Sequence, residues 1–148
     1  KEDYEKHRKY LRELTEKALA LALSSVSDEY AIAHLGEGWV AEETWAIALY
    51  CAVRYINSPE QAIIASVNHD GDSDSTGSVT GNIIGAIYGY NYIKERNLLC
   101  PDGCKIEQTL ELANIILTIA DDLTTSCIIS EYDYHHTPEK QQWFDRYC

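Results

Sequence analysis

The chain has 148 residues, 45% of them hydrophobic, and 24 acidic against 12 basic side chains give it a formal net charge of -12. The length predicts one domain over residues 1–148, and the charge excludes non-specific nucleic-acid binding, because an acidic surface repels a phosphate backbone. No apolar run reaches the roughly 18 residues that a membrane span needs, and no signal peptide is recognisable, so we expect no association with a membrane.

Hydrophobic spacing, capping residues and turn residues predict helices in chain order and no strand. The first helix is expected over residues 4–26, where Leu11, Leu14 and Ala18 recur at helical spacing. Later helices are expected over residues 29–35, 41–56, 59–67, 75–96 and 106–129, and the polar tail 130–148 is expected to wrap the surface. The predicted fold class is therefore all-α, a compact multi-helix domain.

Two short segments carry signals for helix ends. Ser27 is expected either to stop the first helix or to cap the second. Ser58 is expected to be the N-cap of its helix, with Pro59 at the first helical position. Trp39 and Trp45 are interpreted first as core residues. Trp39 lies in a loop between glycines, so it is also the better candidate for contact with a nucleobase.

The helix expected over residues 75–96 carries a glycine at every fourth position, at Gly77, Gly81, Gly85 and Gly89. Residues four apart lie on one face of a helix. Each glycine in a helix interior costs about 0.5–1 kcal/mol relative to alanine. The favoured interpretation is a smooth stripe that lets another backbone pack closely.

Residues 70–75 gather oxygen ligands immediately before that helix. Asp70, Asp72 and Asp74 supply carboxylates, and Ser73 and Ser75 supply hydroxyls. Crowded like charges are unfavourable unless a cation lies between them, and Mg²⁺ and Ca²⁺ both prefer oxygen ligands. One of these side chains is also expected to cap the helix, but capping does not need three carboxylates. The stretch therefore predicts a site for a divalent cation.

An EF-hand is the alternative calcium site, because Asp70, Asp72 and Asp74 match the first three ligand positions of its loop. The sequence disfavours it. Ser75 stands where that loop needs glycine, and Gly81 stands where it needs glutamate.

The cysteines are five in number and do not follow the spacing of a small disulfide-rich scaffold. Reduced thiols, and therefore a cytoplasmic protein, are the simplest interpretation. Cys100 and Cys104 could form half of a zinc site with His135 and His136. The paired ligand spacing of such sites is missing, so a turn flanked by two small apolar residues is favoured.

Two motifs together resemble a known family. The stretch HDGDSDSTG at residues 69–77, with the glycines that follow it, resembles the carboxy-terminal metal motif of the ADP-ribosylglycohydrolases, the dinitrogenase reductase-activating glycohydrolase-like family. The stretch LGEGWVAEE at residues 35–43 looks like the segment that precedes this motif in bacterial members. The resemblance covers at least residues 30–95 and fits the helices predicted on either side.

The resemblance implies an all-α domain whose cleft holds two divalent cations, usually magnesium, against the ribose hydroxyls of an ADP-ribosyl group. It implies hydrolysis of the bond between the ribose C1 and a protein side chain or other acceptor, with the metal ions orienting and polarising oxygen atoms. Asp72 and Asp74 then stand as carboxylate ligands, and Ser75 stands where the family has a threonine or serine hydroxyl ligand.

Further residues are expected close to these ligands. Asp70 replaces a glycine common in relatives and adds one more charge beside the substrate. Gly38 and Trp39 are expected to contact the substrate, with the indole against the adenine. His69 is expected to orient a carboxylate, and a purely structural hydrogen bond is the alternative.

The family's other metal ligands lie in an amino-terminal half, in a Thr-Asp-Asp-Thr-like motif, and a catalytic acidic residue is expected there. The present sequence has no such motif and no methionine at position 1, so we expect the carboxy-terminal half of a glycohydrolase, weakly active or inactive alone. Asp121 and Asp122 are interpreted as the polar face of the last helix. Glu42 and Glu43 are interpreted as first-turn acids that favour the helix dipole.

Three functions remain open at this point. The first is metal-dependent hydrolysis of ADP-ribosyl linkages, with an ADP-ribosylated substrate as the partner. The second is a binding module that holds ADP-ribose or metal without turnover. The third is a structural half-domain that pairs with a missing half or with a second copy, since large exposed apolar patches mark interfaces.

Overall fold

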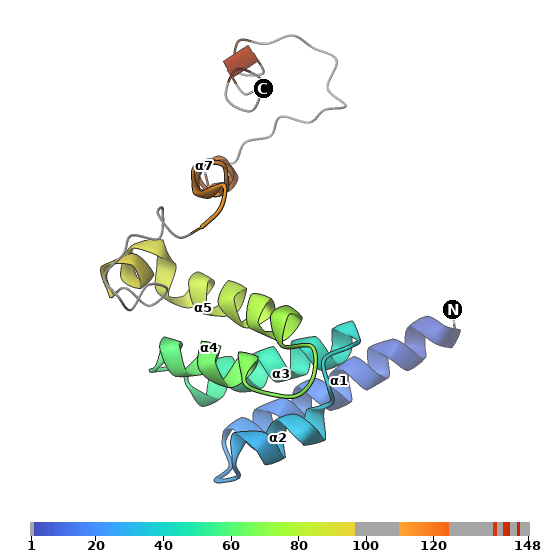
Figure 1. Cartoon of the computed structure of the whole chain (residues 1–148). Coiled ribbons are helices and arrows are strands. Elements are labelled where there is room, and N and C mark those ends of the chain that lie inside the picture. Colours follow the sequence, from blue (N-terminus) through green and yellow to red (C-terminus); the bar gives the residue numbers. More distant parts are fainter. Residues whose placement is uncertain (1, 97–109, 125–137, 139–140, 143–144, 146–148) are drawn as a thin grey trace. The chain divides into compact units, whose positions relative to one another are not determined.

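The computed structural model describes residues 2–96, 110–124, 138, 141–142 and 145, and every regular element within these residues is a helix (Figure 1). In chain order the helices are α1 (Glu2–Ala22), α2 (Asp28–Leu35), α3 (Ala41–Arg54), α4 (Pro59–Val67), α5 (Ser73–Glu95) and α7 (Ala113–Thr124). The prediction of an all-α fold is confirmed for the described residues. None of the helices found there is both long enough and apolar enough to span a membrane.

The chain divides into two compact units, Lys1–Leu98 and Leu99–Cys148. The first unit holds α1 to α5, and the second holds α7. Side chains that the zinc alternative needs, Cys100, Cys104, His135 and His136, lie outside the described residues, as does most of the tail 130–148. One domain over residues 1–148 stays a prediction.

The first helix ends earlier than its sequence pattern indicates, at Ala22 rather than Val26. The guanidinium of Arg54 in α3 donates hydrogen bonds to the backbone carbonyls of Ala22, Ser24 and Val26. These carbonyls would otherwise lack partners at a helix end. The arginine therefore holds the chain in a turn where local propensity favours more helix.

The second helix begins at its predicted cap. The Ser27 hydroxyl oxygen accepts the backbone N–H of Tyr30 over 3.3 Å, which is the N-cap interaction. Pro59 is the first residue of α4 as predicted, and Ser58 holds the N-cap position, but the Ser58 side chain makes no capping hydrogen bond. Residue type therefore placed both helix starts correctly, although only one serine acts through its hydroxyl.

The core of the first unit lies around α3, which contacts α1, α2, α4 and α5. Its buried residues include Ala46, Ile47, Tyr50 and Cys51. Helix α1 contributes Leu14, Ala18 and Ala22 to the same cluster, in agreement with its predicted face. Because α3 is in contact with four helices, it is buried over most of its circumference.

The glycine stripe of α5 has several different roles. A Cβ at Gly77 would lie 2.6 Å from Cγ1 of Val67, so this glycine does permit close packing against α4. Gly81 is in ordinary contact range of Ile63, and no described atom would come within 4 Å of a Cβ at Gly85. The expectation of one continuous packing stripe is therefore wrong within the described residues.

The last glycine of the stripe, Gly89, marks a kink instead. Its φ of 75° and ψ of 159° are not helical, and α5 continues beyond it as a second helical run. A positive φ is a conformation that glycine adopts without steric cost.

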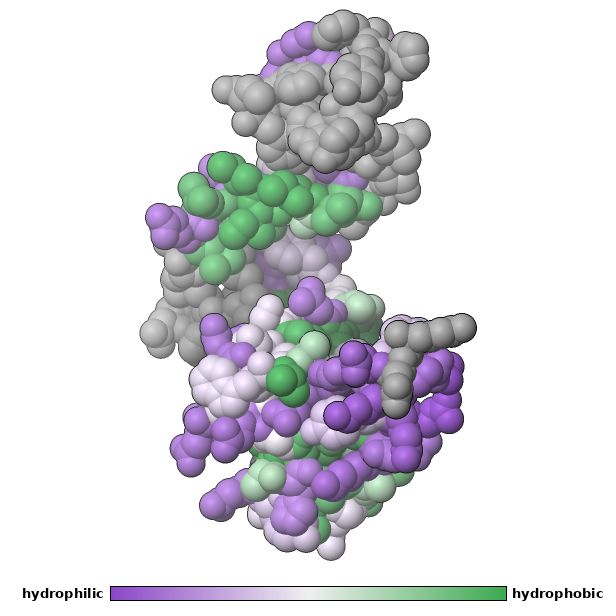
Figure 2. Space-filling model, turned by 90° about the vertical axis from the view of Figure 1, so that its right-hand side faces the viewer, coloured by the Kyte–Doolittle hydropathy of each residue, from purple (hydrophilic) through white to green (hydrophobic). Residues whose placement is uncertain are grey.

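The helix of the second unit, α7, lies within the predicted range 106–129, whose two ends are outside the described residues. Four of its large apolar side chains are substantially exposed: Ile115, Ile116, Ile119 and Leu123. Figure 2 shows them as a hydrophobic band over this helix. Asp121 is exposed, in agreement with a polar face at that position.

Candidate functional site

The glycine loop, residues 36–40, contains two residues whose backbone conformation favours glycine. Gly36 has a φ of 127° and Gly38 a φ of 82°. A Cβ at Gly36 would overlap the Glu43 side chain, and a Cβ at Gly38 would lie 3.0 Å from Cγ2 of Thr76. The loop therefore needs glycine both for its conformation and for its close neighbours.

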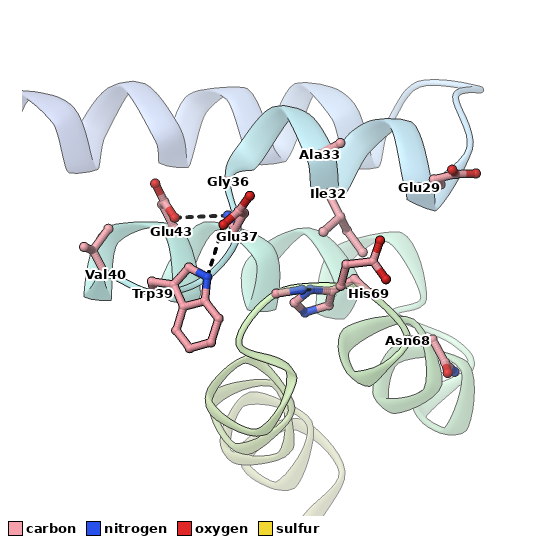
Figure 3. Close-up of a pocket in the computed structure, with 12 residues that line it drawn as sticks. Glu29, Ile32, Ala33, Gly36, Glu37, Trp39, Val40, Glu43, Asn68 and His69 are labelled. Atoms are coloured by element: carbon pink, nitrogen blue, oxygen red, sulfur yellow. Dashed lines mark hydrogen bonds between the residues drawn. The ribbon is translucent and has the colours of Figure 1, made fainter.

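The carboxylate of Glu43 fixes this loop from the first turn of α3 (Figure 3). Its Oε2 accepts the backbone N–H groups of Glu37 and Gly38 over 3.1 and 3.2 Å. Its Oε1 accepts the Tyr10 hydroxyl over 3.4 Å. On the carbonyl side, Thr44 Oγ1 donates to the Gly38 oxygen over 2.7 Å. Two adjacent side chains of α3 thus satisfy donors and an acceptor of the loop.

The acidic loop, residues 68–72, joins the glycine loop through its backbone. The N–H of Asp72 donates to the carbonyl of Glu37 over 2.7 Å. A Cβ at Gly71 would overlap that carbonyl, so only glycine allows the two backbones to approach so closely. The motifs at residues 35–43 and 69–77, which are far apart in sequence, are therefore in direct backbone contact.

The imidazole of His69 organises the acidic loop from within. Its Nδ1 accepts the backbone N–H of Gly71 over 3.1 Å, so the neutral ring carries its proton on Nε2 and donates to Thr76 Oγ1 over 2.9 Å. The Thr76 hydroxyl in turn donates to the carbonyl of Ser66 over 2.7 Å. These contacts are with backbone and hydroxyl groups, which matches the structural alternative for His69.

The candidate metal ligands Asp72, Asp74 and Ser75 lie together at the amino-terminal end of α5. Asp72 is the N-cap, and its Oδ1 accepts the backbone N–H of Ser75 over 3.4 Å. A hydrogen bond with the neighbouring Asp74 carboxyl, followed by one with the Ser75 side chain, lowers the pKa of Asp72. A carboxylate that accepts hydrogen bonds keeps its charge to lower pH. The predicted capping role of this segment is therefore filled by Asp72, which is also one of the three candidate ligands.

These three side chains face a cavity of about 690 Å³. Other residues that line this cavity are Gly38, Trp39, Val40, Thr44, Trp45 and Ser78. Both the glycine loop and the start of α5 therefore contribute walls, so the predicted ligands and the predicted substrate contacts at Gly38 and Trp39 come together.

A second, larger cavity of about 910 Å³ is also lined by residues of these two loops (Figure 3). His69 and Asp70 line this second cavity, with Glu29, Ile32 and Asn68. Trp39 and Val40 contribute to both cavities. The structure therefore does not bring Asp70 together with Asp72 and Asp74, although the three alternate in sequence.

The interpretation of Trp39 and Trp45 as core residues is wrong. The exposed fractions are 67% for Trp39 and 38% for Trp45. Trp39 Nε1 donates to Glu37 Oε2 over 3.1 Å, and Trp45 Nε1 donates to Thr15 Oγ1 over 3.1 Å. Both rings stay at the surface because their N–H groups find polar partners there, and both border the cavity beside the carboxylates.

The oxygen ligands offered by Asp72, Asp74 and Ser75 suit magnesium better than a metal ion that takes all its ligands from the protein. Two adjacent carboxylates and one hydroxyl are hard oxygen ligands, and magnesium keeps several waters and needs only one or two carboxylates. Among the described residues, no group of three or more His, Cys, Asp or Glu side chains could hold a metal ion. Asp72, Asp74 and Ser75 thus fit part of a magnesium site.

The interpretation of Glu43 as a first-turn acid that favours the helix dipole missed its hydrogen bonds to the glycine loop. A glutamate at the third helical position, counted from Ala41, is the local signal of a side chain that reaches back to backbone N–H groups. Here it reaches past the N-cap residue, Val40, to the N–H groups of Glu37 and Gly38. Thr76 was also missed, because nothing in its local sequence indicates that it is buried and bonded to Ser66.

The ADP-ribosylglycohydrolase family model matches residues 1–128. The chain belongs to the ADP-ribosylglycohydrolase family, which confirms the resemblance drawn from the two motifs.

Curated relatives give a more specific similarity. The chain is similar to ADP-ribosylhydrolase ARH3 of Homo sapiens, at 32% identity over 82 residues, which are 49% of this chain and 23% of that protein. The Bos taurus protein of the same name is 31% identical over 85 residues, which are 51% of this chain and 23% of the relative. The matched segments thus span less than a quarter of these relatives. No solved structure matches the chain.

Proposed function

We propose that this chain provides part of a magnesium-dependent site that hydrolyses ADP-ribosyl linkages. Family membership and the similarity to proteins named ADP-ribosylhydrolase support the reaction class. The observation that carries the proposal is the shared cavity. Asp72, Asp74 and Ser75 face it from the start of α5, and Gly38 and Trp39 face it from the glycine loop.

In this proposal, the carboxylates of Asp72 and Asp74 and the hydroxyl of Ser75 hold a magnesium ion, with water in the remaining positions. The ion orients and polarises ribose hydroxyls and water when it is bound. Ser75 also holds Asp72 in place through its backbone N–H. The exposed indole of Trp39, which lines the same cavity, offers a face for the adenine.

We place the catalytic group and the remaining ligands of a two-metal site outside these 148 residues. The described residues offer no third carboxylate or imidazole beside Asp72 and Asp74. A site with few protein ligands binds metal weakly. Alone, the chain is then weakly active or inactive, and turnover requires a second half of the site, from another segment or another copy.

Calorimetric titration of ADP-ribose into the chain, with magnesium and then with a chelator, tests this function. We expect binding that requires magnesium and that disappears in the Asp72→Ala/Asp74→Ala variant. The matched control is Asp121→Ala/Asp122→Ala, which removes two adjacent carboxylates in the other unit. Equal loss in both variants, or binding that the chelator leaves unchanged, would argue against a metal site at Asp72.

A binding module without turnover is the second candidate, and the small number of ligands in the described residues favours it. It makes the same prediction for the titration. The two differ in single-turnover assays on an ADP-ribosylated peptide with the chain in excess. Release of ADP-ribose that depends on Asp72 supports the hydrolase, whereas magnesium-dependent binding without release supports the module.

A further inference from the structure

We propose that Glu43 is a positioning residue for the acidic loop, and that it acts on Asp72 through the glycine loop. This inference rests on the proposed function, because it assumes that Asp72 is a metal ligand. Glu43 itself does not line the cavity that Asp72 and Asp74 face. It lines the larger cavity and accepts hydrogen bonds from the glycine loop (Figure 3).

The first link joins Glu43 to the glycine loop. One oxygen, Oε2, accepts two successive N–H groups, those of Glu37 and Gly38. Hydrogen bonds to a charged acceptor are stronger than neutral ones. With the positive φ of Gly36 and Gly38, they fix the direction in which the peptide units of this loop point.

The second link joins the glycine loop to the ligand. The N–H of Glu37 donates to Glu43, and the carbonyl of the same residue accepts the N–H of Asp72 over 2.7 Å. Glu37 is therefore held on both sides of its backbone. Since Gly71 lies directly against that carbonyl, the acidic loop cannot shift unless the glycine loop shifts with it.

The third link explains why a neighbouring acid does not serve the same purpose. Glu42, one residue earlier on α3, accepts a hydrogen bond from His7 Nδ1 over 2.8 Å and makes none to the glycine loop. Tyr10 holds the other oxygen of Glu43 from α1. The Glu43 carboxylate thus ties α1, the glycine loop and the acidic loop to one point of α3.

Two measurements on the whole chain test the inference. One is the exchange rate of the Asp72 amide hydrogen in the absence of metal, and the other is the dissociation constant for Mn²⁺ as a spectroscopic substitute for Mg²⁺. For Glu43→Ala we expect faster exchange at Asp72 and a metal affinity lower by about 10- to 100-fold, the range seen when partners of metal ligands are removed. For Glu43→Gln we expect both values to stay near those of the wild type, because the amide oxygen still accepts the loop N–H groups.

Glu42→Ala is the matched control, and it should change neither the exchange of the Asp72 amide nor the metal affinity. Should Glu43→Ala unfold the chain, Gly71→Ala breaks the same link from the acidic loop and leaves Glu43 intact. It should likewise speed exchange of the Asp72 amide and lower the metal affinity, because a Cβ at Gly71 overlaps the Glu37 carbonyl. Unchanged exchange at Asp72 in Glu43→Ala would overturn the positioning role. Absence of Mn²⁺ binding in the wild type would instead overturn the proposed function, while the exchange measurement still tests the link.

Discussion

The hydroxyl of Tyr50 donates a hydrogen bond to Asp28 Oδ1 over 2.6 Å, although the Tyr50 side chain is completely buried. The other oxygen of the same carboxylate accepts the Tyr55 hydroxyl over 2.6 Å. Asp28 is the first residue of α2, and both tyrosines come from the end of α3. This carboxylate therefore joins the two helices that flank the glycine loop.

We expect Tyr50→Phe to lower the free energy of unfolding by about 1–3 kcal/mol, since Asp28 loses a buried donor that water cannot fully replace. Urea denaturation measures the change. Tyr4→Phe, at an exposed position of α1, is the matched control and should stay within about 0.5 kcal/mol of the wild type. A Tyr50→Phe variant as stable as this control would show that the bond contributes nothing.

Alkaline pH should destabilise the chain through Cys51. Burial, and then the charge of Asp28, raise the pKa of the Cys51 thiol from 9.0 to about 12. A raised pKa means that the contribution is fully present below pH 9.0 and is lost as pH rises through the folded value. Over this window the native state keeps a proton that the unfolded state has released, so stability falls by about 1.4 kcal/mol per pH unit for this group.

Urea denaturation at a series of alkaline pH values measures that slope. Cys51→Ala removes the thiol, so its stability should fall less steeply with pH than that of the wild type. Part of the slope should persist, because burial raises the pKa of Tyr50 and the hydrogen bond to Asp28 raises the pKa of Tyr55. Parallel slopes for wild type and variant would contradict an inaccessible, protonated Cys51.

Two glycines of α5 should respond to alanine with opposite signs. Gly85→Ala should raise the free energy of unfolding by about 0.5–1 kcal/mol, because the new methyl group meets open space and alanine favours the helix. Gly77→Ala should lower it by about 1–3 kcal/mol, because the methyl group meets Val67. Thermal unfolding of the two variants beside the wild type decides the matter. Loss of stability in both variants would instead support the expectation of one continuous packing stripe.

Trp39→Ala should weaken ADP-ribose binding without changing metal affinity. Stacking of a base on an aromatic ring contributes about 1–3 kcal/mol, and the exposed Trp39 indole lines the same cavity as the carboxylates. Calorimetry with ADP-ribose and with magnesium alone separates the two effects. Trp39→Phe keeps a ring and should retain most of the affinity. An equal loss in the alanine and phenylalanine variants would mean that stacking is not the cause.

The sequence predicted helix identity well because amphipathic spacing and residue types at helix ends are local signals. Leu14, Ala18 and Ala22 are buried as their spacing indicates, and Ser27 and Pro59 stand at helix starts. The sequence prediction was wrong where a residue distant in sequence determines the end of a helix. The end of α1 depends on Arg54, which lies in another helix, and no local pattern reveals that contact.

In the candidate site, too, local sequence predicted some features, whereas others depend on contacts between distant residues. The structure brings Asp72, Asp74 and Ser75 to the same cavity as Gly38 and Trp39, and their roles as ligands and substrate contacts stay predictions. The motif could not show that Asp70 turns to a different cavity, because alternation in sequence determines the side-chain direction only in a strand, and these residues form a loop and a helix start. The role of Glu43 was hidden as well, since it depends on how the chain folds back between residues 37 and 72.

The position of Asp72 at the N-cap of α5 also bears on how long an ion stays bound. The first turn of a helix carries a partial positive charge, which stabilises carboxylates before any cation arrives. The same charge opposes a cation that approaches them. The proposed site is therefore shaped and charged in the empty state, and a bound magnesium ion should exchange with solvent more rapidly than one held by two carboxylates in a neutral loop.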